Sequence, residues 1–313
     1  MASKTAAKKI VVCGGNGFLG SRICKYAVAR GWDVTSISRS GEPKWSAVTS
    51  SESPPEWSHK VSWERADIFK PATYAPLLTG ADYVVHSMGI LLEADYKRVV
   101  SGQESPIAGL RKAFSQPASS SSSADSSIEN PLERNDNSST PSSSSSSNNS
   151  STSTDSNDKS PQITYESMNR DSALLLARTA ADKSASAFLY VSAAGGAPVL
   201  PTRYITTKRS AESRIASEFP RMRGIFIRPP FLYDSSRKFT IPMAAMTGVG
   251  AMFNSVTGGI MSGFLGAAGT KPLKVDVVAK AAVEALEDES TRGPVEVPEL
   301  EDLAEKAWRK GML

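Results

Sequence analysis

The chain is poor in the residues that build metal sites, disulfide scaffolds and nucleic-acid surfaces. It holds two cysteines and two histidines among 313 residues, and its net charge is only +4. Cys13 and Cys24 have no Cys or His neighbours at metal-ligand spacing, and His59 and His86 lie far apart. No dense run of Lys or Arg is present in the sequence. These shortages argue against a metal site, a disulfide framework and a nucleic-acid partner.

The N-terminal residues lack the apolar core of a secretory signal. Met1–Lys9 is short and basic, and an apolar strand-like run begins directly after it. A cleaved mitochondrial presequence would cut into that strand. We therefore expect residues 1–8 to form a flexible, solvated tail, although lysines without any acid are also compatible with uncleaved import into mitochondria.

One internal segment lacks the apolar side chains that folding requires. Between residues 115 and 160, 21 of the 46 residues are serine. Such a segment buries too little apolar surface to offset the entropy of ordering it, so we expect a disordered insertion. Removing these 46 residues from 313 leaves 267, which is enough for one α/β domain. We predict that residues 9–313 form this single domain, interrupted by the insertion.

Residues 239–270 lack charge altogether. This stretch of 32 residues is long enough to cross a membrane. Seven glycines interrupt it, however, whereas a spanning helix would be more uniformly apolar. We expect an apolar lid, a wall of a substrate pocket or a surface that rests on a membrane, with ordinary core packing as the alternative.

Apolar strand-like runs alternate with helical patterns along the chain. This alternation is typical of an α/β fold with a Rossmann-type, doubly wound parallel sheet, and it resumes beyond the serine-rich insertion. Residues 229–313 remain to build a small substrate lobe within the same domain. The expected strands are 9–13, 33–38, 61–65, 81–86, 187–192 and 224–228, and the expected helices end near residue 30 and span 74–78, 164–181 and 204–217.

A glycine-rich turn separates the first expected strand from the first expected helix. Its three glycines permit a tight turn, close approach of a pyrophosphate and packing of helix on strand. The N-terminus of the helix then offers free N–H groups and a positive dipole to the phosphates. We predict dinucleotide binding here, with a ligand-free glycine turn as the alternative. The expected cofactor contacts are Gly14, Asn16, Gly17, Phe18, Leu19 and Gly20.

The end of the second expected strand has no carboxylate. An acidic residue at this place would bind the ribose hydroxyls of NAD, but residues 36–40 read Ser-Ile-Ser-Arg-Ser. Arg39 could instead pair with the 2′-phosphate of NADP. We therefore expect NADP(H) as the preferred cofactor. NAD(H) is the alternative, with Arg39 as an ordinary solvated residue.

Tyr204 and Lys208 lie four residues apart on an expected helix and so share one of its faces. The charge of Lys208 would lower the pKa of Tyr204 and make it a proton donor or acceptor near neutral pH. Ser192 ends the preceding expected strand and could orient a substrate carbonyl or hydroxyl. Asn169 is either a bridge to Lys208 or an ordinary helix-start residue. We predict Tyr204, Lys208 and Ser192 as the catalytic residues.

Together these motifs resemble the extended or atypical branch of the short-chain dehydrogenase/reductase superfamily, which includes the epimerase/dehydratase-like proteins. The resemblance implies that Tyr204 is the general acid/base and that Lys208 also binds the nicotinamide ribose. It further implies that Asp67 and Ile68 flank the adenine. The further cofactor contacts implied are Ser87, Gly89 and Pro229. The matching positions are 14–20, 67–68, 86–89, Asn169, Tyr204 with Lys208, Arg228-Pro229 and 275–279.

Residues 10–40, 165–171 and 190–208 more closely resemble a fungal mitochondrial family associated with coenzyme Q biosynthesis and related to a complex I accessory subunit. This resemblance implies a place on the matrix side of the inner membrane, next to the quinone-biosynthesis complex, with peripheral membrane contact. One departure concerns the usual catalytic Ser or Thr. A shift of one residue would put Ala193 at that position and leave Ser192 beside it.

Two functions fit these observations. The first is an NAD(P)(H)-dependent oxidoreductase acting on a hydrophobic small molecule in coenzyme Q biosynthesis. The second is a non-catalytic nucleotide-binding subunit that stabilises a quinone-biosynthesis or respiratory complex. The presence of both Tyr204 and Lys208 favours chemistry, because a scaffold does not need the pair. The same pair argues against a third interpretation, a redox-sensing regulator.

Overall fold

The structure is a computed structural model, and the residues that it describes all lie within the segments 1–93 and 163–313. The described residues are 7–49, 51–89, 164–195, 202–234 and 271–312.

Several segments singled out in the sequence lie outside the described residues. They include most of the predicted tail at residues 1–8, the whole insertion at 115–160 and the uncharged segment 239–270. Within the described part of the chain, no helix combines the length and the apolar character needed to span a membrane.

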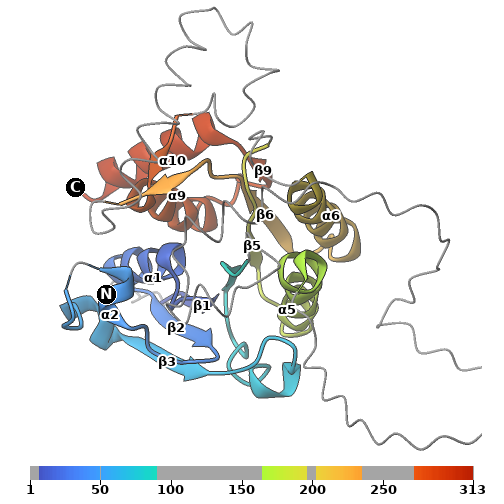
Figure 1. Cartoon of the computed structure of the whole chain (residues 1–313), viewed down its shortest axis with the longest axis horizontal. Coiled ribbons are helices and arrows are strands. Elements are labelled where there is room, and N and C mark those ends of the chain that lie inside the picture. Colours follow the sequence, from blue (N-terminus) through green and yellow to red (C-terminus); the bar gives the residue numbers. More distant parts are fainter. Residues whose placement is uncertain (1–6, 50, 90–163, 196–201, 235–270, 313) are drawn as a thin grey trace, which may run out of the picture. The chain divides into compact units, whose positions relative to one another are not determined.

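Seven strands form one parallel sheet in the order β3-β2-β1-β4-β5-β6-β9 (Figure 1). Each neighbouring pair is parallel, which confirms the predicted doubly wound, Rossmann-type fold. β4 and β5 pair from Tyr83 opposite Ala187, so the chain returns to the same sheet after the insertion. The strands are β1 Lys9–Cys13, β2 Asp33–Ser38, β3 Val61–Arg65, β4 Tyr83–His86, β5 Ala187–Val191, β6 Arg223–Ile227 and β9 Gly293–Val295.

Helices cover both faces of this sheet because successive side chains of each strand point to opposite faces. Ile10 and Val12 of β1 pack into one core cluster, whereas Val11 and Cys13 pack into the other. The first cluster contains α1 Phe18–Ala29, α9 Val275–Glu287 and α10 Val297–Lys310. The second contains α5 Ser172–Asp182 and α6 Thr202–Glu218.

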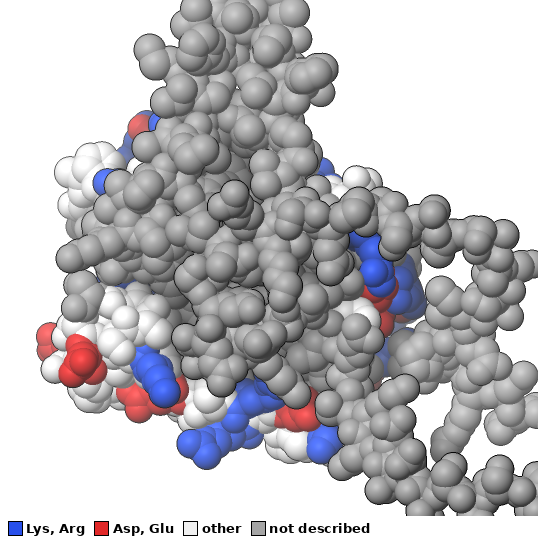
Figure 2. Space-filling view, in the orientation of Figure 1, with Lys and Arg blue, Asp and Glu red and all other residues white. Residues whose placement is uncertain are grey.

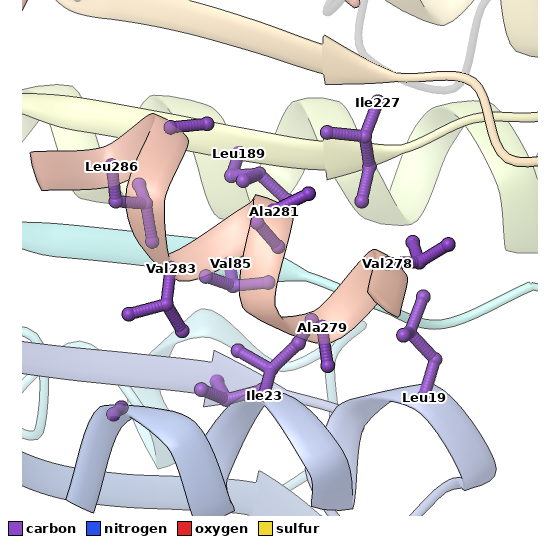
Figure 3. Packing of buried hydrophobic residues seen from close by; sticks show 14 of the residues in the cluster. Leu19, Ile23, Val85, Leu189, Ile227, Val278, Ala279, Ala281, Val283 and Leu286 are labelled. Carbon is purple, nitrogen blue, oxygen red and sulfur yellow. The ribbon is translucent and has the colours of Figure 1, made fainter. Parts of the chain in front are cut away.

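The close packing of α1, α9 and the sheet fixes the position of the glycine-rich turn. Leu19 and Ile23 on α1 lie against Val278 and Ala279 on α9, as Figure 3 shows. The small side chains of α9 let the two helices approach above the central strands. The N-terminus of α1 is therefore held at one end of the sheet by core contacts.

Two expected helices differ from the structure. Residues 74–78 were expected to form a helix, but the helical residues are the short 3-10 helix η2, Pro71–Thr73. Pro76 interrupts the segment because it lacks a backbone N–H. The expected helix at 164–181 begins as the π-helix η3, Glu166–Asp171, and continues as α5.

The described part of the expected substrate lobe, 229–313, contributes largely to the central fold. β9 extends the sheet, and α9 and α10 cover one of its faces. A separate two-stranded sheet joins β7 Leu232–Tyr233 to β8 Leu273–Lys274. A substrate-binding role for this lobe stays a prediction. The remaining helices are α2 Trp45–Val48 and η1 Glu56–Lys60.

Charges of both signs are interspersed on the described surface. Figure 2 shows Lys and Arg beside Asp and Glu on the described part of one face. On α10, Lys306 lies 2.5 Å from Asp288 and Lys310 lies 2.7 Å from Glu284. These pairs spread positive charge among acids rather than concentrating it.

Candidate functional site

The glycine-rich turn between β1 and α1 has room for backbone only. Gly14 has a φ of +85°, a conformation that L side chains rarely adopt. A Cβ on Gly20 would lie 2.2 Å from the Gly14 carbonyl oxygen, and one on Gly17 would lie 3.1 Å from it. The turn therefore requires glycine on steric grounds as well as for the approach of a ligand.

The N-terminus of α1 suits a phosphate group. Gly17 is the N-cap in extended conformation and provides no side-chain cap, and the first turn contains no acidic residue. Its N–H groups and positive dipole are thus not neutralised by a side chain of the helix itself. These features fit the pyrophosphate of a dinucleotide.

Ser87, which follows β4, is hydrogen-bonded to the last residue of β1, directly before this turn. The Ser87 hydroxyl donates to the Cys13 carbonyl oxygen over 2.9 Å, and the Ser87 N–H donates to the same oxygen over 2.9 Å. A Cβ on Gly14 would lie 3.0 Å from the Ser87 hydroxyl oxygen. β1 and β4 are the strands at which the sheet order reverses, the usual ligand position in such sheets. The structure thus brings the predicted contact Ser87 to the glycine turn.

Asn16 links the glycine turn to the loop after β2. Its side-chain amide donates to the Ser40 hydroxyl over 2.7 Å, which positions the neighbouring Arg39. Arg39 is exposed, as is Arg65, and Ser38 pairs with Arg65 where β2 and β3 lie side by side. Among the described residues neither guanidinium has a carboxylate partner. Two free cations therefore lie near the end of β2.

Four of the predicted cofactor contacts have only part of their structure available to a ligand. The side chains of Leu19 and Ile68 are buried in the two core clusters, so only their backbone could face a cofactor. One carboxylate oxygen of Asp67 accepts the Phe69 N–H over 3.1 Å. Phe18 is partly buried against the core at the start of α1.

Lys208 lies buried where the ends of β4 and β5 meet α6. Its side chain reaches across so that Nζ donates to the Val191 carbonyl oxygen over 2.9 Å. A Cβ on Gly89 would lie 2.8 Å from Asn169 Oδ1 and 3.4 Å from Lys208 Nζ. The predicted residues Gly89, Asn169 and Lys208 are therefore neighbours, and the missing side chain of Gly89 permits this.

Tyr204 packs beside Lys208 at the same end of the sheet. Its ring centroid lies 5.5 Å from Lys208 Nζ and 5.8 Å from the ring centroid of Tyr165. Met88 and Met168 complete the apolar cluster around it. The structure thus joins Tyr204 to Lys208 and, through Met88, to the residues that follow β4.

Burial governs the protonation of both residues. Burial raises the pKa of Tyr204 above its usual range, whereas the sequence predicted that Lys208 would lower it. Burial also lowers the pKa of Lys208 to about 7, despite the nearby Glu212 carboxylate, which opposes this shift. A lysine that is only partly charged at neutral pH exerts a weaker pull on the tyrosine proton. Tyr204 therefore holds its proton at neutral pH in the cofactor-free protein.

Ser192 lies at the end of β5, but its hydroxyl is used within the protein. The hydroxyl donates to the Glu212 carboxylate and accepts a hydrogen bond from Arg209 Nη1 over 2.9 Å. Its predicted role in orienting a substrate would require these bonds to break. The next residue, Ala193, has no hydroxyl, and its carbonyl oxygen accepts Arg209 Nη2 over 2.8 Å.

Sequence reasoning missed the importance of Glu212. This buried carboxylate on α6 also binds Arg228, which in turn pairs with Glu296 over 2.5 Å. Pro229, which follows Arg228, accepts the Ala194 N–H over 2.9 Å and so ties the chain after β6 to the chain after β5. The sequence did contain one signal for this residue: Glu212 lies four residues after Lys208, so the two share one face of the helix.

His86 is a second buried group that the sequence did not assign. Its Nε2 lies 2.9 Å from the Ser172 hydroxyl, which itself donates to the Met168 carbonyl oxygen over 2.7 Å. Burial and the charge of Lys208 lower the pKa of His86 to about 3. It is therefore neutral near physiological pH. Among the described residues, no cluster of three or more His, Cys, Asp or Glu could hold a metal ion.

Residues 10–96 match the model of the NAD dependent epimerase/dehydratase family. The chain is also 35% identical over 242 residues to MIOREX complex component 2 of Saccharomyces cerevisiae, covering 73% of this chain and 74% of that protein. The chain belongs to the NAD-dependent epimerase/dehydratase family. The site described above is thus built on the NAD(P)-binding, short-chain dehydrogenase/reductase-like fold of that family.

Solved structures share the fold at low sequence identity. UDP-N-acetylglucosamine 4-epimerase from Bacillus cereus is 13% identical, with a TM-score of 0.50 and coverage of 95% of this chain and 83% of that chain. UDP-glucuronic acid 4-epimerase from the same organism, in complex with NAD, is 14% identical, with a TM-score of 0.50 and coverage of 92% and 76%. These similarities support the Rossmann-type fold of the chain.

Proposed function

We propose that the protein is a mitochondrial NADP(H)-dependent oxidoreductase that acts on a hydrophobic substrate in coenzyme Q biosynthesis, with Tyr204 and Lys208 as its acid–base pair. One observation carries the proposal. The site is continuous from the glycine turn to the tyrosine: Ser87 donates to the Cys13 carbonyl oxygen directly before the turn, and Gly89 lies against Lys208. Lys208 in turn lies beside the Tyr204 ring.

The chain's own groups would divide the work between binding and proton transfer. The glycine turn and the N-terminus of α1 would hold the pyrophosphate. Lys208 has two hydrogen-bond acceptors among the described residues, Val191 and Tyr190, so one of its three N–H groups remains for the nicotinamide ribose. The bound cofactor would supply the hydride.

Tyr204 would provide the proton. Because burial raises its pKa, the phenol is protonated at neutral pH, which suits donation to a carbonyl oxygen during reduction. Met88, Met168 and Tyr165 form an apolar surround for this hydroxyl-bearing ring. Methionine side chains adapt to irregular apolar shapes, which supports a hydrophobic substrate.

Arg39 and Arg65 support the preference for NADP(H). Both guanidiniums are exposed at the ends of β2 and β3, and the Asn16–Ser40 hydrogen bond holds the Arg39 loop against the glycine turn. Calorimetry should give tighter binding of NADPH than of NADH by the wild type. Arg39→Ala should weaken NADPH binding about tenfold and leave NADH binding unchanged, because only the 2′-phosphate contact is lost.

Arg178→Ala, an exposed arginine on α5, is the matched control and should change neither affinity. Equal affinity of the wild type for both cofactors would contradict the assignment of NADP(H).

The second candidate is a non-catalytic subunit of a mitochondrial complex. Two observations favour it: the Ser192 hydroxyl is engaged by Glu212 and Arg209, and the yeast relative is named as a component of a complex. A stabilising subunit could bind nucleotide without turning over a substrate.

The substitution Tyr204→Phe separates the two candidates. It removes the proton donor while keeping the ring that packs on Tyr165. We expect this variant to bind NADPH with unchanged affinity but to fail to restore quinone levels in a strain that lacks the protein. Tyr74→Phe, in the buried core, should restore them fully. Full restoration by Tyr204→Phe would instead establish the non-catalytic subunit.

A further inference from the structure

Tyr190 is a buried tyrosine that neither the sequence nor the proposed reaction assigns. It lies in β5, next to Val191, and is fully inaccessible to solvent. Its hydroxyl donates to the Asn169 carbonyl oxygen over 2.5 Å, and Asn169 belongs to the π-helix η3. Short π-helical segments often occur at functional sites. The hydroxyl thus ties β5 to an irregular helical turn beside the site.

The same side chain contacts the Lys208 ammonium in two ways. Lys208 Nζ lies 3.5 Å from the Tyr190 hydroxyl oxygen, which can accept one of its N–H groups. Nζ also lies 5.0 Å from the Tyr190 ring centroid, within the range of cation–π attraction. The Tyr204 ring lies 5.5 Å away. Two tyrosine rings therefore contact one buried ammonium.

We propose that Tyr190 is a positioning residue that holds the Lys208 ammonium at the cofactor site and stabilises its charged form. Its hydroxyl and ring compensate in part for the water that Lys208 has lost on burial. The Asn169 carbonyl fixes the direction of the Tyr190 hydroxyl, because the single phenolic proton is used on that oxygen. The lone pairs of the hydroxyl are then left to accept from Lys208.

The other titratable and charged groups around Lys208 do not hold its ammonium in the way proposed for Tyr190. Glu212, one turn further along α6, favours the charged lysine, and Arg209 disfavours it. Glu212 is already engaged by Arg209 and Arg228. From β4, His86 packs its ring 5.5 Å from that of Tyr190 and is neutral near physiological pH because burial lowers its pKa to about 3. On β5, the polar side chain that contacts the Lys208 ammonium directly is therefore that of Tyr190.

The test is an NMR titration of the full-length protein labelled with ¹³C at lysine Cε. The Lys208 signal is assigned by its absence in Lys208→Met. In the wild type its midpoint should lie near pH 7, since burial lowers the pKa of Lys208 to about 7. Tyr190→Phe keeps the ring but removes the hydroxyl, and should lower the midpoint by about half a pH unit. Tyr190→Leu also removes the ring and should lower it by about one unit.

Tyr74→Phe is the matched control because it removes a buried hydroxyl from the same core cluster, away from Lys208. It should leave the Lys208 midpoint unchanged. An unchanged midpoint in both Tyr190 variants, or an equal shift in Tyr74→Phe, would overturn the inference. If the Tyr190 variants do not fold, ¹³Cζ-tyrosine signals of the wild type decide. Because the Tyr204 ring also lies near Lys208, the same spectra are recorded for Tyr204→Phe. A change in the chemical shift of a buried tyrosine at the Lys208 midpoint that persists in Tyr204→Phe supports the inference, and its absence contradicts it.

The contribution of Tyr190 to catalysis rests on the proposed function, whereas its hold on Lys208 does not. If the protein is a reductase, the pH profile of NADPH oxidation with a hydrophobic quinone as the carbonyl acceptor should move with the NMR midpoint in Tyr190→Phe. The titration needs no turnover. A wild type without reductase activity would contradict the proposed function, and the Lys208 midpoints would still decide the role of Tyr190.

Discussion

The two sides of the candidate site differ in composition: backbone atoms form the β1–β4 side, and buried polar side chains form the β5–α6 side. On the β1–β4 side, the turn at Gly14–Gly20 and the residues after β4 place backbone atoms where a cofactor would lie. On the β5–α6 side, buried polar side chains make the site: Lys208, Glu212 and Ser192 are all nearly inaccessible to solvent. The β1–β4 side therefore depends on glycines that have no side chain. The β5–α6 side depends on hydrogen-bond and charge partners for its buried polar side chains.

This difference decides how each side tolerates substitution. On the β1–β4 side, a methyl group added to a glycine meets a main-chain atom that cannot move without changing the conformation of the turn. On the β5–α6 side, removal of a polar group leaves a buried charge or hydrogen-bonding atom without its partner. The first kind of change should abolish binding, and the second should mainly reduce stability.

The largest effect on cofactor binding is expected at Gly20. In Gly20→Ala the new Cβ would lie 2.2 Å from the Gly14 carbonyl oxygen and 2.6 Å from the Ser87 hydroxyl, so the turn must open. We expect NADPH binding to weaken at least about 100-fold, and the protein to lose roughly 3 kcal/mol of stability. Calorimetry and urea unfolding measure these two losses.

Gly311→Ala provides the control for glycine replacement. A Cβ there meets its nearest atom at 3.5 Å, an ordinary contact near the end of α10. This variant should bind NADPH like the wild type. Normal NADPH affinity in Gly20→Ala would show that the turn is not the cofactor-binding element.

The next effect on cofactor binding is smaller and is expected at Glu212, where the main loss is in stability. Glu212→Gln removes the carboxylate that pairs with Arg209 and Arg228 on the side-chain half of the site. Two guanidiniums then lose their buried counter-charge, which should cost about 3–5 kcal/mol in urea unfolding. NADPH affinity of the folded fraction should fall far less than in Gly20→Ala.

Glu218→Gln is the matched control, because Glu218 lies on the same helix and pairs with Arg214 at partly exposed positions. It should cost about 0.5 kcal/mol or less. Similar losses for Glu212→Gln and Glu218→Gln would contradict a structural role for the buried network.

The same contrast explains how much the sequence could predict. The glycine turn, the parallel strands and the Tyr204–Lys208 spacing follow from local periodicity, and the structure joins them at one end of the sheet. The bonding of Ser192 could not be predicted because Glu212 lies 20 residues away and Arg228 further still. The raised pKa of Tyr204 likewise depends on burial among residues from η3 and the end of β4. Pro76, by contrast, was a local signal that argued against a helix at 74–78.

The smallest loss of stability is expected at Ser192. This residue tests whether the β5–α6 side of the site keeps its hydrogen bonds when substrate binds. Ser192→Ala removes one hydrogen bond to Glu212 while both arginines remain, so stability should fall by only about 1 kcal/mol. Ser172→Ala, which removes another buried hydroxyl, should cost a similar amount.

If the Ser192 hydroxyl serves Glu212, NADPH affinity should be unchanged and the ability to restore quinone levels should survive in Ser192→Ala, unlike Tyr204→Phe. If Ser192→Ala instead fails to restore quinone levels while keeping its stability and NADPH affinity, the hydroxyl must leave Glu212 to contact the substrate. The side-chain half of the site would then rearrange on binding, whereas the glycine turn, constrained by its own backbone, would not.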